Sequence, residues 1–207
     1  MAYVSTTTLW YATRATGITA LVLLTTTMVM GLLTAKRTWT RRWPGFAQQE
    51  LHRRLSIVTV AFVAIHVLTS VIDTYVHIGW LAVVVPFVSP YKPFWVALGA
   101  IALDLLLAVF ITSLLREHLS AGSWRAVHWV AYGSWPVALA HPFGMGTDSR
   151  EHWVTLLGVI CVAAVGGALL WRVRARAAQL QAARRVAAGQ VDQITSLRLP
   201  RHVGSAR

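Results

Sequence analysis

The sequence predicts an all-α membrane protein, a bundle of five transmembrane helices. Hydrophobic residues make up 56% of the 207 residues and charged residues only 13%, whereas soluble domains carry roughly 25% charged residues. The charges lie in short basic stretches between long apolar segments, which is the pattern of a chain that crosses a bilayer several times. Tryptophans such as Trp10, Trp95 and Trp171 fall near the segment ends, where aromatic belts lie.

Five segments are long and apolar enough to cross a bilayer, which takes about 20 residues each. They lie at about residues 16–35, 51–72, 94–115, 124–141 and 153–171. We expect the first to be a true span rather than a signal peptide, because residues 1–5 contain no basic n-region, the apolar run is long, and Lys36 and Arg37 follow it. The fourth is the shortest and contains Gly133 and Pro136.

Two further stretches complete the chain. Residues 80–91 are apolar but short and are broken by Pro86 and Pro90, so we expect an interfacial or re-entrant cap over the outer face of the bundle. Residues 1–172 form the predicted membrane domain. Residues 173–207 form a basic cytoplasmic tail, expected to continue the fifth helix and to become irregular past Ser196.

Basic residues predict the orientation of the bundle. One side carries most of them: Lys36, Arg37, Arg41, Arg42, Arg53, Arg54, Arg116, Arg125, Arg172, Arg174, Arg176, Arg184, Arg185, Arg198, Arg201 and Arg207. The other side has Arg14, Lys92 and Arg150. The positive-inside rule therefore places the N-terminus outside and the C-terminus in the cytoplasm of a multi-pass plasma-membrane protein, as an odd number of spans requires.

The net charge of +12 does not indicate a nucleic-acid partner, because the basic residues adjoin apolar spans rather than form a folded basic face. We expect membrane lipid as the surrounding partner instead. Cys161 is the single cysteine, which excludes an intramolecular disulfide and a cysteine-rich zinc site.

Four histidines carry the predicted chemistry, because ionisable residues inside a bilayer are costly and neutral imidazole binds iron well. His52 and His66 are fourteen residues apart on the second span, about 21 Å along a helix and about 40° apart around it. His128 and His141 are thirteen apart on the fourth, about 20 Å along the helix but about 140° apart around it. A kink or bulge at Pro136 would correct this phase.

Topology predicts how the histidines pair. Both spans run from inside to outside, so His52 and His128 share the inner depth, and His66 and His141 share the outer depth. We call His52–His128 the inner pair and His66–His141 the outer pair. Each pair has two axial imidazoles for one planar macrocycle, with the two metals about 20 Å apart.

These residues resemble a known family. The stretches LHRRL (51–55), AIHV (64–67), WRAVHW (124–129) and AH (140–141) are similar to the ferric-reductase-like transmembrane domain shared by NADPH oxidases, ferric reductases and bacterial relatives. The resemblance implies two b-type haems ligated by His52, His66, His128 and His141. It also implies an oxidoreductase role, with electrons crossing from a cytoplasmic-side donor to an extracytoplasmic acceptor such as ferric iron, oxygen or a flavoprotein.

The chain departs from the larger relatives in two respects. Many relatives have six spans, and larger ones add a flavin and nicotinamide domain, whereas no G-x-G-x-x-G fingerprint follows a strand here. We therefore expect electrons from a separate partner, either a flavoprotein reductase or a membrane quinol. Arg53, Arg54 and Arg125 flank the inner histidines, where guanidinium groups can pair with haem propionates or with lipid headgroups.

Two alternative functions stay open at this point. One is a quinol-linked cytochrome b subunit, and the other is a non-redox membrane anchor or assembly subunit whose histidines hydrogen-bond between helices. A proton or metal transporter would need several carboxylates in the spans, and only Asp104 qualifies, with Asp73 at an edge. Asp104 is expected either to form a helix–helix hydrogen bond, or to relay a proton or accept a hydrogen bond from the free nitrogen of a ligand histidine.

Overall fold

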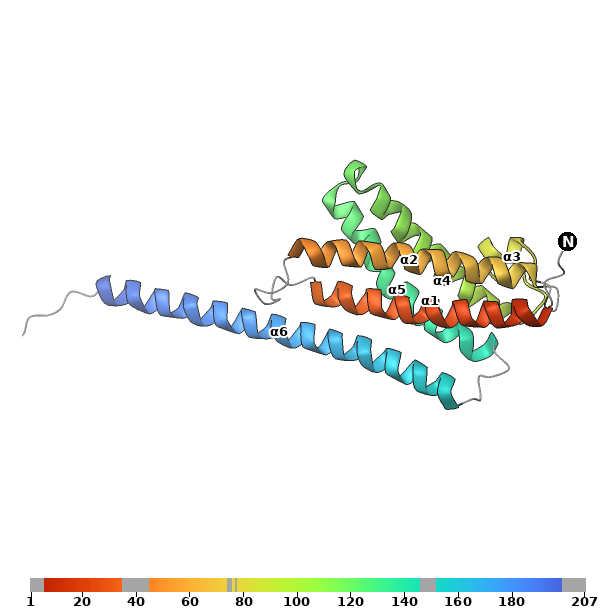
Figure 1. The fold of residues 1–207 in the computed structure, drawn as a ribbon. Helices are drawn as coiled ribbons and strands as arrows, with labels where there is room; N and C mark the ends of the chain where they lie inside the picture. The colour runs from red at the N-terminus through yellow and green to blue at the C-terminus, as the bar shows by residue number, and fades with distance from the viewer. Residues whose placement is uncertain (1–5, 35–44, 74–75, 77, 146–151, 199–207) are drawn as a thin grey trace, which may run out of the picture. The chain divides into compact units, whose positions relative to one another are not determined.

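The computed structural model describes residues 6–34, 45–73, 76, 78–145 and 152–198, and these residues form helices and connecting segments without a strand (Figure 1). The helices are α1 (Thr6–Thr34), α2 (Gly45–Ile72), α3 (Leu81–Val84), α4 (Pro93–Leu114), the 3₁₀ turn η1 (Arg116–His118), α5 (Ala121–Met145) and α6 (His152–Arg198). The predicted all-α class is confirmed for the described residues.

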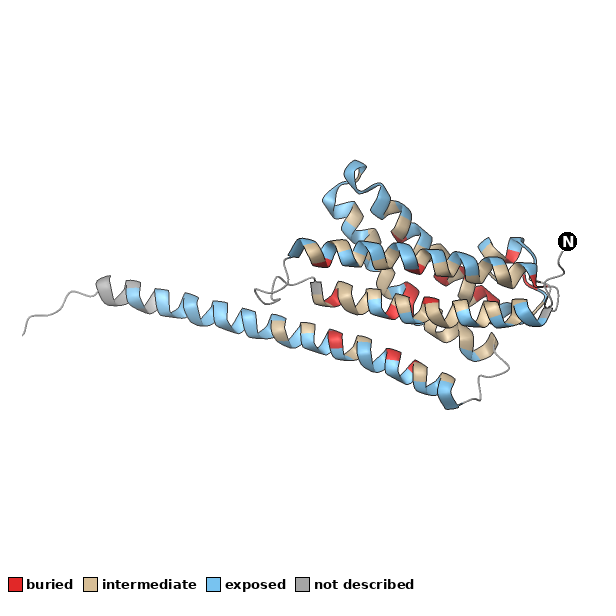
Figure 2. Cartoon of the chain, in the orientation of Figure 1, coloured by how far each residue is buried: buried red, intermediate tan, exposed pale blue. Residues whose placement is uncertain are grey.

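Four of the described helices are long and apolar enough to cross a membrane, namely α1, α2, α4 and α6. They correspond to the first, second, third and fifth predicted spans. The fourth predicted span falls in α5, whose hydropathy places it outside this group. Large apolar side chains such as Ile57, Ile65 and Leu68 are exposed on α2, as expected for a surface that faces lipid. Figure 2 shows exposed residues along much of this helix.

The helices of residues 1–166 associate in two pairs, α1 with α2 and α4 with α5. Small buried residues on α4, among them Ala97 and Ala100, allow a close approach of neighbouring backbones. Polar contacts join the helices midway. The Thr27 and Thr59 hydroxyl oxygens lie 3.3 Å apart between α1 and α2. Trp135 Nε1 donates a buried hydrogen bond of 3.0 Å to Thr25 Oγ1, joining α5 to α1.

The ends of α4 and α5 follow from local chemistry. Pro93 begins α4, since the first helical position needs no backbone N–H. The backbone N–H of Ser123 donates to Ser120 Oγ, which caps the start of α5. The helix α5 then continues through Pro136 and Pro142 to Met145, so it extends four residues beyond the span predicted to end at residue 141.

The predicted cap segment, residues 80–91, contains the short helix α3, which packs on α4. Trp80, Leu81 and Phe87 expose their apolar side chains there, as at a membrane interface. Lys92 adopts a left-handed conformation just before α4 and donates from Nζ to the Gly144 carbonyl of α5 at 2.7 Å. The cap segment is thus tied to the neighbouring ends of α4 and α5.

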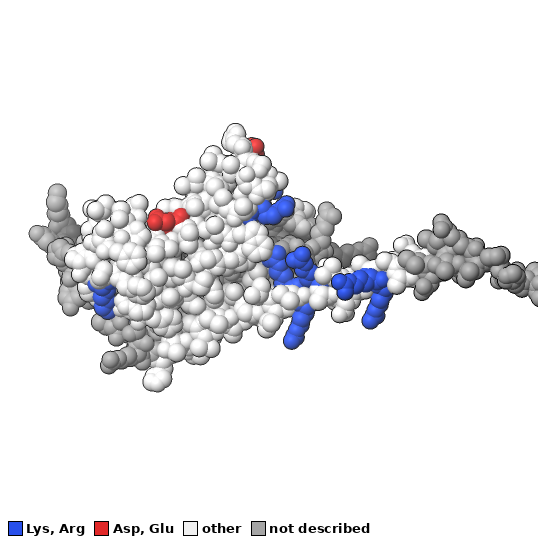
Figure 3. Space-filling view, turned by 180° about the vertical axis from the view of Figure 1, so that it is seen from behind, with Lys and Arg blue, Asp and Glu red and all other residues white. Residues whose placement is uncertain are grey.

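The chain forms two compact units, residues 1–166 and residues 167–207. Within the second unit the helix continues to Arg198, which confirms that the basic tail continues the last helix, two residues past the predicted change at Ser196. Its arginines include Arg174, Arg176, Arg184 and Arg185, and Figure 3 shows basic side chains along this helix. The predicted boundary at residue 172 stays a prediction.

Candidate functional site

The structure brings the four predicted histidines together in the two predicted pairs. His52 and His66 lie on α2, and His128 and His141 lie on α5. In the inner pair the ring centres of His52 and His128 are 6.5 Å apart with an interplanar angle of 65°. In the outer pair the ring centres of His66 and His141 are also 6.5 Å apart, at 83°. Both histidines of α5 therefore reach their partners despite the unfavourable phase of a thirteen-residue spacing.

This separation is the one that a metal between two imidazoles requires. Metal–imidazole bonds of about 2 Å on both sides place the two ring centres roughly 6 Å apart, because each bonding nitrogen lies about 1 Å from its ring centre. The described residues contain no group of three or more potential metal-ligating side chains. Each pair can supply two protein ligands, which is the number that a bis-histidine haem takes from its protein.

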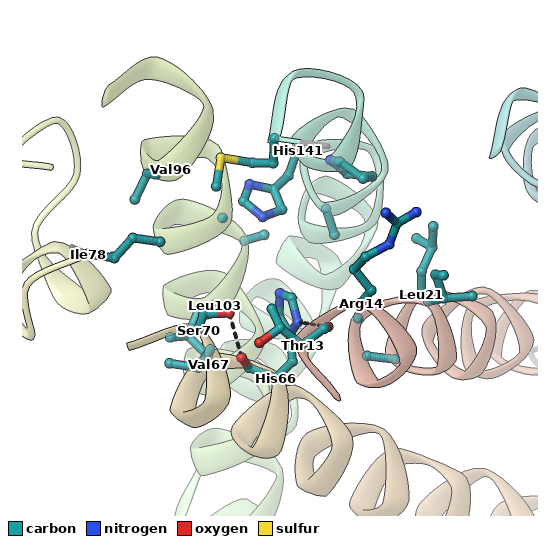
Figure 4. A pocket seen from close by; sticks show the side chains of 18 of the residues that line it. Thr13, Arg14, Leu21, His66, Val67, Ser70, Ile78, Val96, Leu103 and His141 are labelled. Atoms are coloured by element: carbon teal, nitrogen blue, oxygen red, sulfur yellow. Dashed lines mark hydrogen bonds between the residues drawn. The ribbon is translucent and has the colours of Figure 1, made fainter. Parts of the chain in front are cut away.

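The outer histidines are each held by a backbone carbonyl. Nδ1 of His66 lies 2.9 Å from the Thr13 carbonyl oxygen of α1, and Nδ1 of His141 lies 2.7 Å from the Trp95 carbonyl oxygen of α4. Figure 4 shows the bond between His66 and Thr13. Because a carbonyl only accepts, each Nδ1 must carry the hydrogen. The lone pair of a neutral ring then resides on Nε2, the tautomer that a metal ligand needs.

The inner histidines have different surroundings. Among the described residues, Nδ1 of His52 and Nδ1 of His128 are buried without a hydrogen-bond partner. The backbone of Thr27 faces the His52 ring without reaching hydrogen-bonding geometry. Trp124 stacks on His128 at 4.9 Å and 22°, and the Arg116 guanidinium lies 4.7 Å from the centre of the Trp124 ring. The inner pair is therefore held by an aromatic stack on one side.

A cavity of about 380 Å³ lies at the outer pair and is lined by both His66 and His141. Its wall is mostly apolar and includes Leu21, Val67 and Leu103 (Figure 4). Binding sites for cofactors are commonly apolar cavities of 300–1,000 Å³ with few polar groups. The buried Thr13 Oγ1, which borders this cavity, has no hydrogen-bond partner within the described part of the chain. A large apolar group with a few polar atoms fits these surroundings.

The comparison with known families agrees with this arrangement. Residues 16–139 match the family described as ferric reductase like transmembrane component. The chain belongs to this family. The matched residues run from α1 into α5 and include His52, His66 and His128, whereas His141 lies two residues beyond them. No curated protein and no solved structure shows a significant match to the chain.

The structure also places the other predicted residues of this member of the ferric-reductase-like family. Arg53 and Arg54 are exposed and pair with Glu50, with nitrogen–oxygen distances of 3.1 Å and 2.6 Å. Arg125 is exposed at the start of α5, and Asp104 is half-buried in the middle of α4. The contacts of Arg53, Arg54 and Arg125 with haem propionates stay a prediction.

Two features of the site were not predicted from the sequence. Trp124 lies four residues before His128, which is the spacing of neighbouring side chains on one helix face, so this stack had a recognisable signal. The carbonyl acceptors of Thr13 and Trp95 had none, because every residue carries a carbonyl and only the packing of the helices selects one.

Proposed function

We propose that this protein carries electrons across a membrane through two b-type haems, held by the inner pair and the outer pair of histidines. The observation that carries the proposal is the equal separation of 6.5 Å between ring centres in two pairs that join the same two helices. Structural histidines that merely hydrogen-bond between helices have no reason to meet at the same separation twice. Bound haem would supply reversible one-electron chemistry at each level.

The residues of the chain set the conditions for that chemistry. The two histidines of each pair would both bind the iron of the haem that they hold, so an acceptor would have to take the electron without binding that iron. The mostly apolar wall around the outer pair lowers the local dielectric constant, which would strengthen electrostatic effects on a bound group. The carbonyls of Thr13 and Trp95 fix the ring orientation of the outer ligands.

We further propose that α5 crosses the membrane as a fifth helix, with the N-terminus outside and the C-terminus in the cytoplasm. Polar residues lower its hydropathy: Ser123, Arg125, His128, Ser134 and His141. Two of these are the proposed ligands, and Ser134 is buried. The function of the helix thus accounts for its weaker apolar character.

Partners follow from this orientation. A separate flavoprotein reductase or a quinol would donate electrons on the cytoplasmic side of the plasma membrane. Ferric iron, oxygen or a partner flavoprotein would accept them outside. Membership of the ferric-reductase-like family supports electron transfer of this kind.

The test is a reduced-minus-oxidised absorption spectrum of the detergent-purified protein, with haem quantified per chain. We expect a sharp low-spin b-type spectrum and about two haems per chain, one for each histidine pair. A colourless protein from haem-replete cells would contradict the proposal and favour a structural or anchoring role.

Single substitutions then test the pairing. His52→Ala and His128→Ala should each remove the inner haem only, and His66→Ala and His141→Ala the outer haem only. The control is His118→Ala in η1, where the side chain is exposed and both haems should stay. If His52→Ala and His141→Ala removed the same haem, the proposed topology would be wrong.

A further inference from the structure

We propose that Gly17 and Gly99 are positioning residues that hold the two outer histidines in the ligand tautomer. Each histidine lies directly against one of these glycines. A Cβ atom added at Gly17 would lie 2.8 Å from Cε1 and 2.9 Å from Nδ1 of His66. One added at Gly99 would lie 2.7 Å from Cε1 and 2.9 Å from Nδ1 of His141. Real Cβ contacts are longer than this, so only glycine leaves room for either ring.

The position of each glycine explains why the ring binds where it does. Gly17 stands four residues after Thr13, and Gly99 stands four residues after Trp95, the residues whose carbonyls accept from the histidines. In an α-helix a side chain lies over the turn that precedes it, so the residue at i+4 covers the carbonyl of residue i. Glycine places no side chain of its own over that carbonyl. The second lone pair of the oxygen can then accept from an imidazole while the first serves the helix. At Thr13 the Thr16 hydroxyl also lies 3.2 Å from the oxygen, but its shorter bond of 2.7 Å goes to the Ala12 carbonyl.

The same spacing recurs fourteen residues later on α1. Gly31 stands four residues after Thr27, and a Cβ added at Gly31 would lie 3.4 Å from Cε1 of His52. The approach is looser here, and His52 Nδ1 does not reach a partner among the described residues. On α1, therefore, a histidine packs closely on glycine and bonds a carbonyl at the outer pair, whereas at the inner pair the packing is looser and the hydrogen bond is missing.

On α4 no glycine stands at the position that would correspond to the inner pair. The residue fourteen after Gly99 is Ser113, whose hydroxyl donates at 2.7 Å to the carbonyl of Val109, four residues before it. A serine hydroxyl thus occupies the carbonyl that a glycine would leave open. On α5, His128 Nδ1 has no partner within the described part of the chain.

The two pairs are therefore chemically unequal, an inference that rests on the proposed function. An Nδ1–H bonded to a carbonyl makes the imidazole a more basic ligand and favours oxidised iron at the outer pair. Gly17 and Gly99 act through His66 and His141, and substituting them should weaken haem binding at the outer pair and raise its midpoint potential. The inner pair should stay unchanged.

The experiment compares four variants of the full-length protein in detergent: Gly17→Ala, Gly99→Ala, Gly31→Ala and Gly166→Ala. The last is the matched control, because Gly166 is also helical and a Cβ added there meets no atom within 4 Å. Two readouts are used, the rate at which excess apomyoglobin removes haem and a spectroscopic redox titration of both haems. Neither depends on catalytic activity.

We expect Gly17→Ala and Gly99→Ala to weaken haem binding at the outer pair roughly 10- to 100-fold, as losses of such supporting groups do. The potential of the outer haem should rise in both variants, with the inner haem retained. Gly31→Ala should have a smaller effect, confined to the inner haem, and Gly166→Ala none. The graded order follows the added contacts of 2.7, 2.8 and 3.4 Å.

Three results would overturn the inference: an unchanged outer haem in Gly17→Ala and Gly99→Ala, equal losses in all four variants, or loss of both haems together in Gly17→Ala. The retained inner haem reports that a variant has folded. A wild-type protein without haem would instead overturn the proposed function. Two wild-type haems with no response to Gly17→Ala would overturn this inference alone.

Discussion

The hydrogen bond between Trp135 and Thr25 leads to the most quantitative prediction. Trp135 Nε1 donates to Thr25 Oγ1 at 3.0 Å, and both residues are buried, with 8% and 6% of their surface exposed. The Thr25 hydroxyl in turn donates a hydrogen bond of 2.8 Å to the Leu21 carbonyl. Trp135 lies between His128 and His141 on α5, so this bond joins α1 to α5 between the two histidine levels.

Thr25→Val keeps the shape of the side chain and removes the acceptor. A buried donor left without a partner costs about 1–3 kcal/mol in soluble proteins. Hydrogen bonds between membrane helices have measured coupling energies averaging about 0.6 and reaching about 1.7 kcal/mol. We therefore expect Thr25→Val to lower the free energy of unfolding by about 1–2 kcal/mol.

The assay is reversible unfolding in mixed detergent, completed as a double-mutant cycle with Trp135→Phe. The matched control is Thr26→Val, because the exposed Thr26 hydroxyl donates at 2.8 Å to the Val22 carbonyl of its own helix. We expect a coupling energy of about 0.6–1.7 kcal/mol between Thr25 and Trp135. Equal effects of Thr25→Val and Thr26→Val, or a coupling near zero, would refute the reasoning.

Two further predictions concern the surroundings of the histidine pairs. Gly144→Ala would place a methyl group inside the space of the Trp95 ring. Such overpacking typically costs about 1–3 kcal/mol and should lower the midpoint temperature of thermal unfolding. An unchanged midpoint would mean that Trp95 moves aside freely. Arg116→Gln removes a cation 4.7 Å from the Trp124 ring that stacks on His128. It should cost about 0.5–1 kcal/mol and lower the midpoint potential of the inner haem, because a positive charge favours the reduced state. A shift confined to the outer haem in a redox titration would contradict that assignment.

The sequence was sufficient to predict which histidines meet. Their spacing along two helices and the parallel direction of those helices determine two depths, and these quantities depend only on helix rise and chain order. The pairing of His52 with His128 and of His66 with His141 could therefore be predicted without knowledge of side-chain packing. The four described helices that are long and apolar enough to cross a membrane were likewise predicted from composition, since a bilayer demands about 20 apolar residues.

The azimuth of the α5 histidines could not be predicted from the same arithmetic. An ideal helix places His128 and His141 about 140° apart, yet both reach partners on α2. The helix contains Pro136 and Pro142, and how a proline-containing helix turns its side chains depends on tertiary packing. The ion pairs of Arg53 and Arg54 with Glu50 had a signal in the sequence, because Glu50 lies three and four residues before these arginines, the spacing of neighbouring side chains on one helix face.

The carbonyl acceptors at Thr13 and Trp95 have an evolutionary consequence. A main-chain oxygen is present whatever the side chain, so substitutions at these two positions can leave the hydrogen bonds to His66 and His141 intact. Alanine scanning of the polar neighbours of the histidines would therefore miss the groups that orient them. Under the proposed ligation, selection for the orientation of the histidines would act on positions 17 and 99, where glycine leaves room for the two rings.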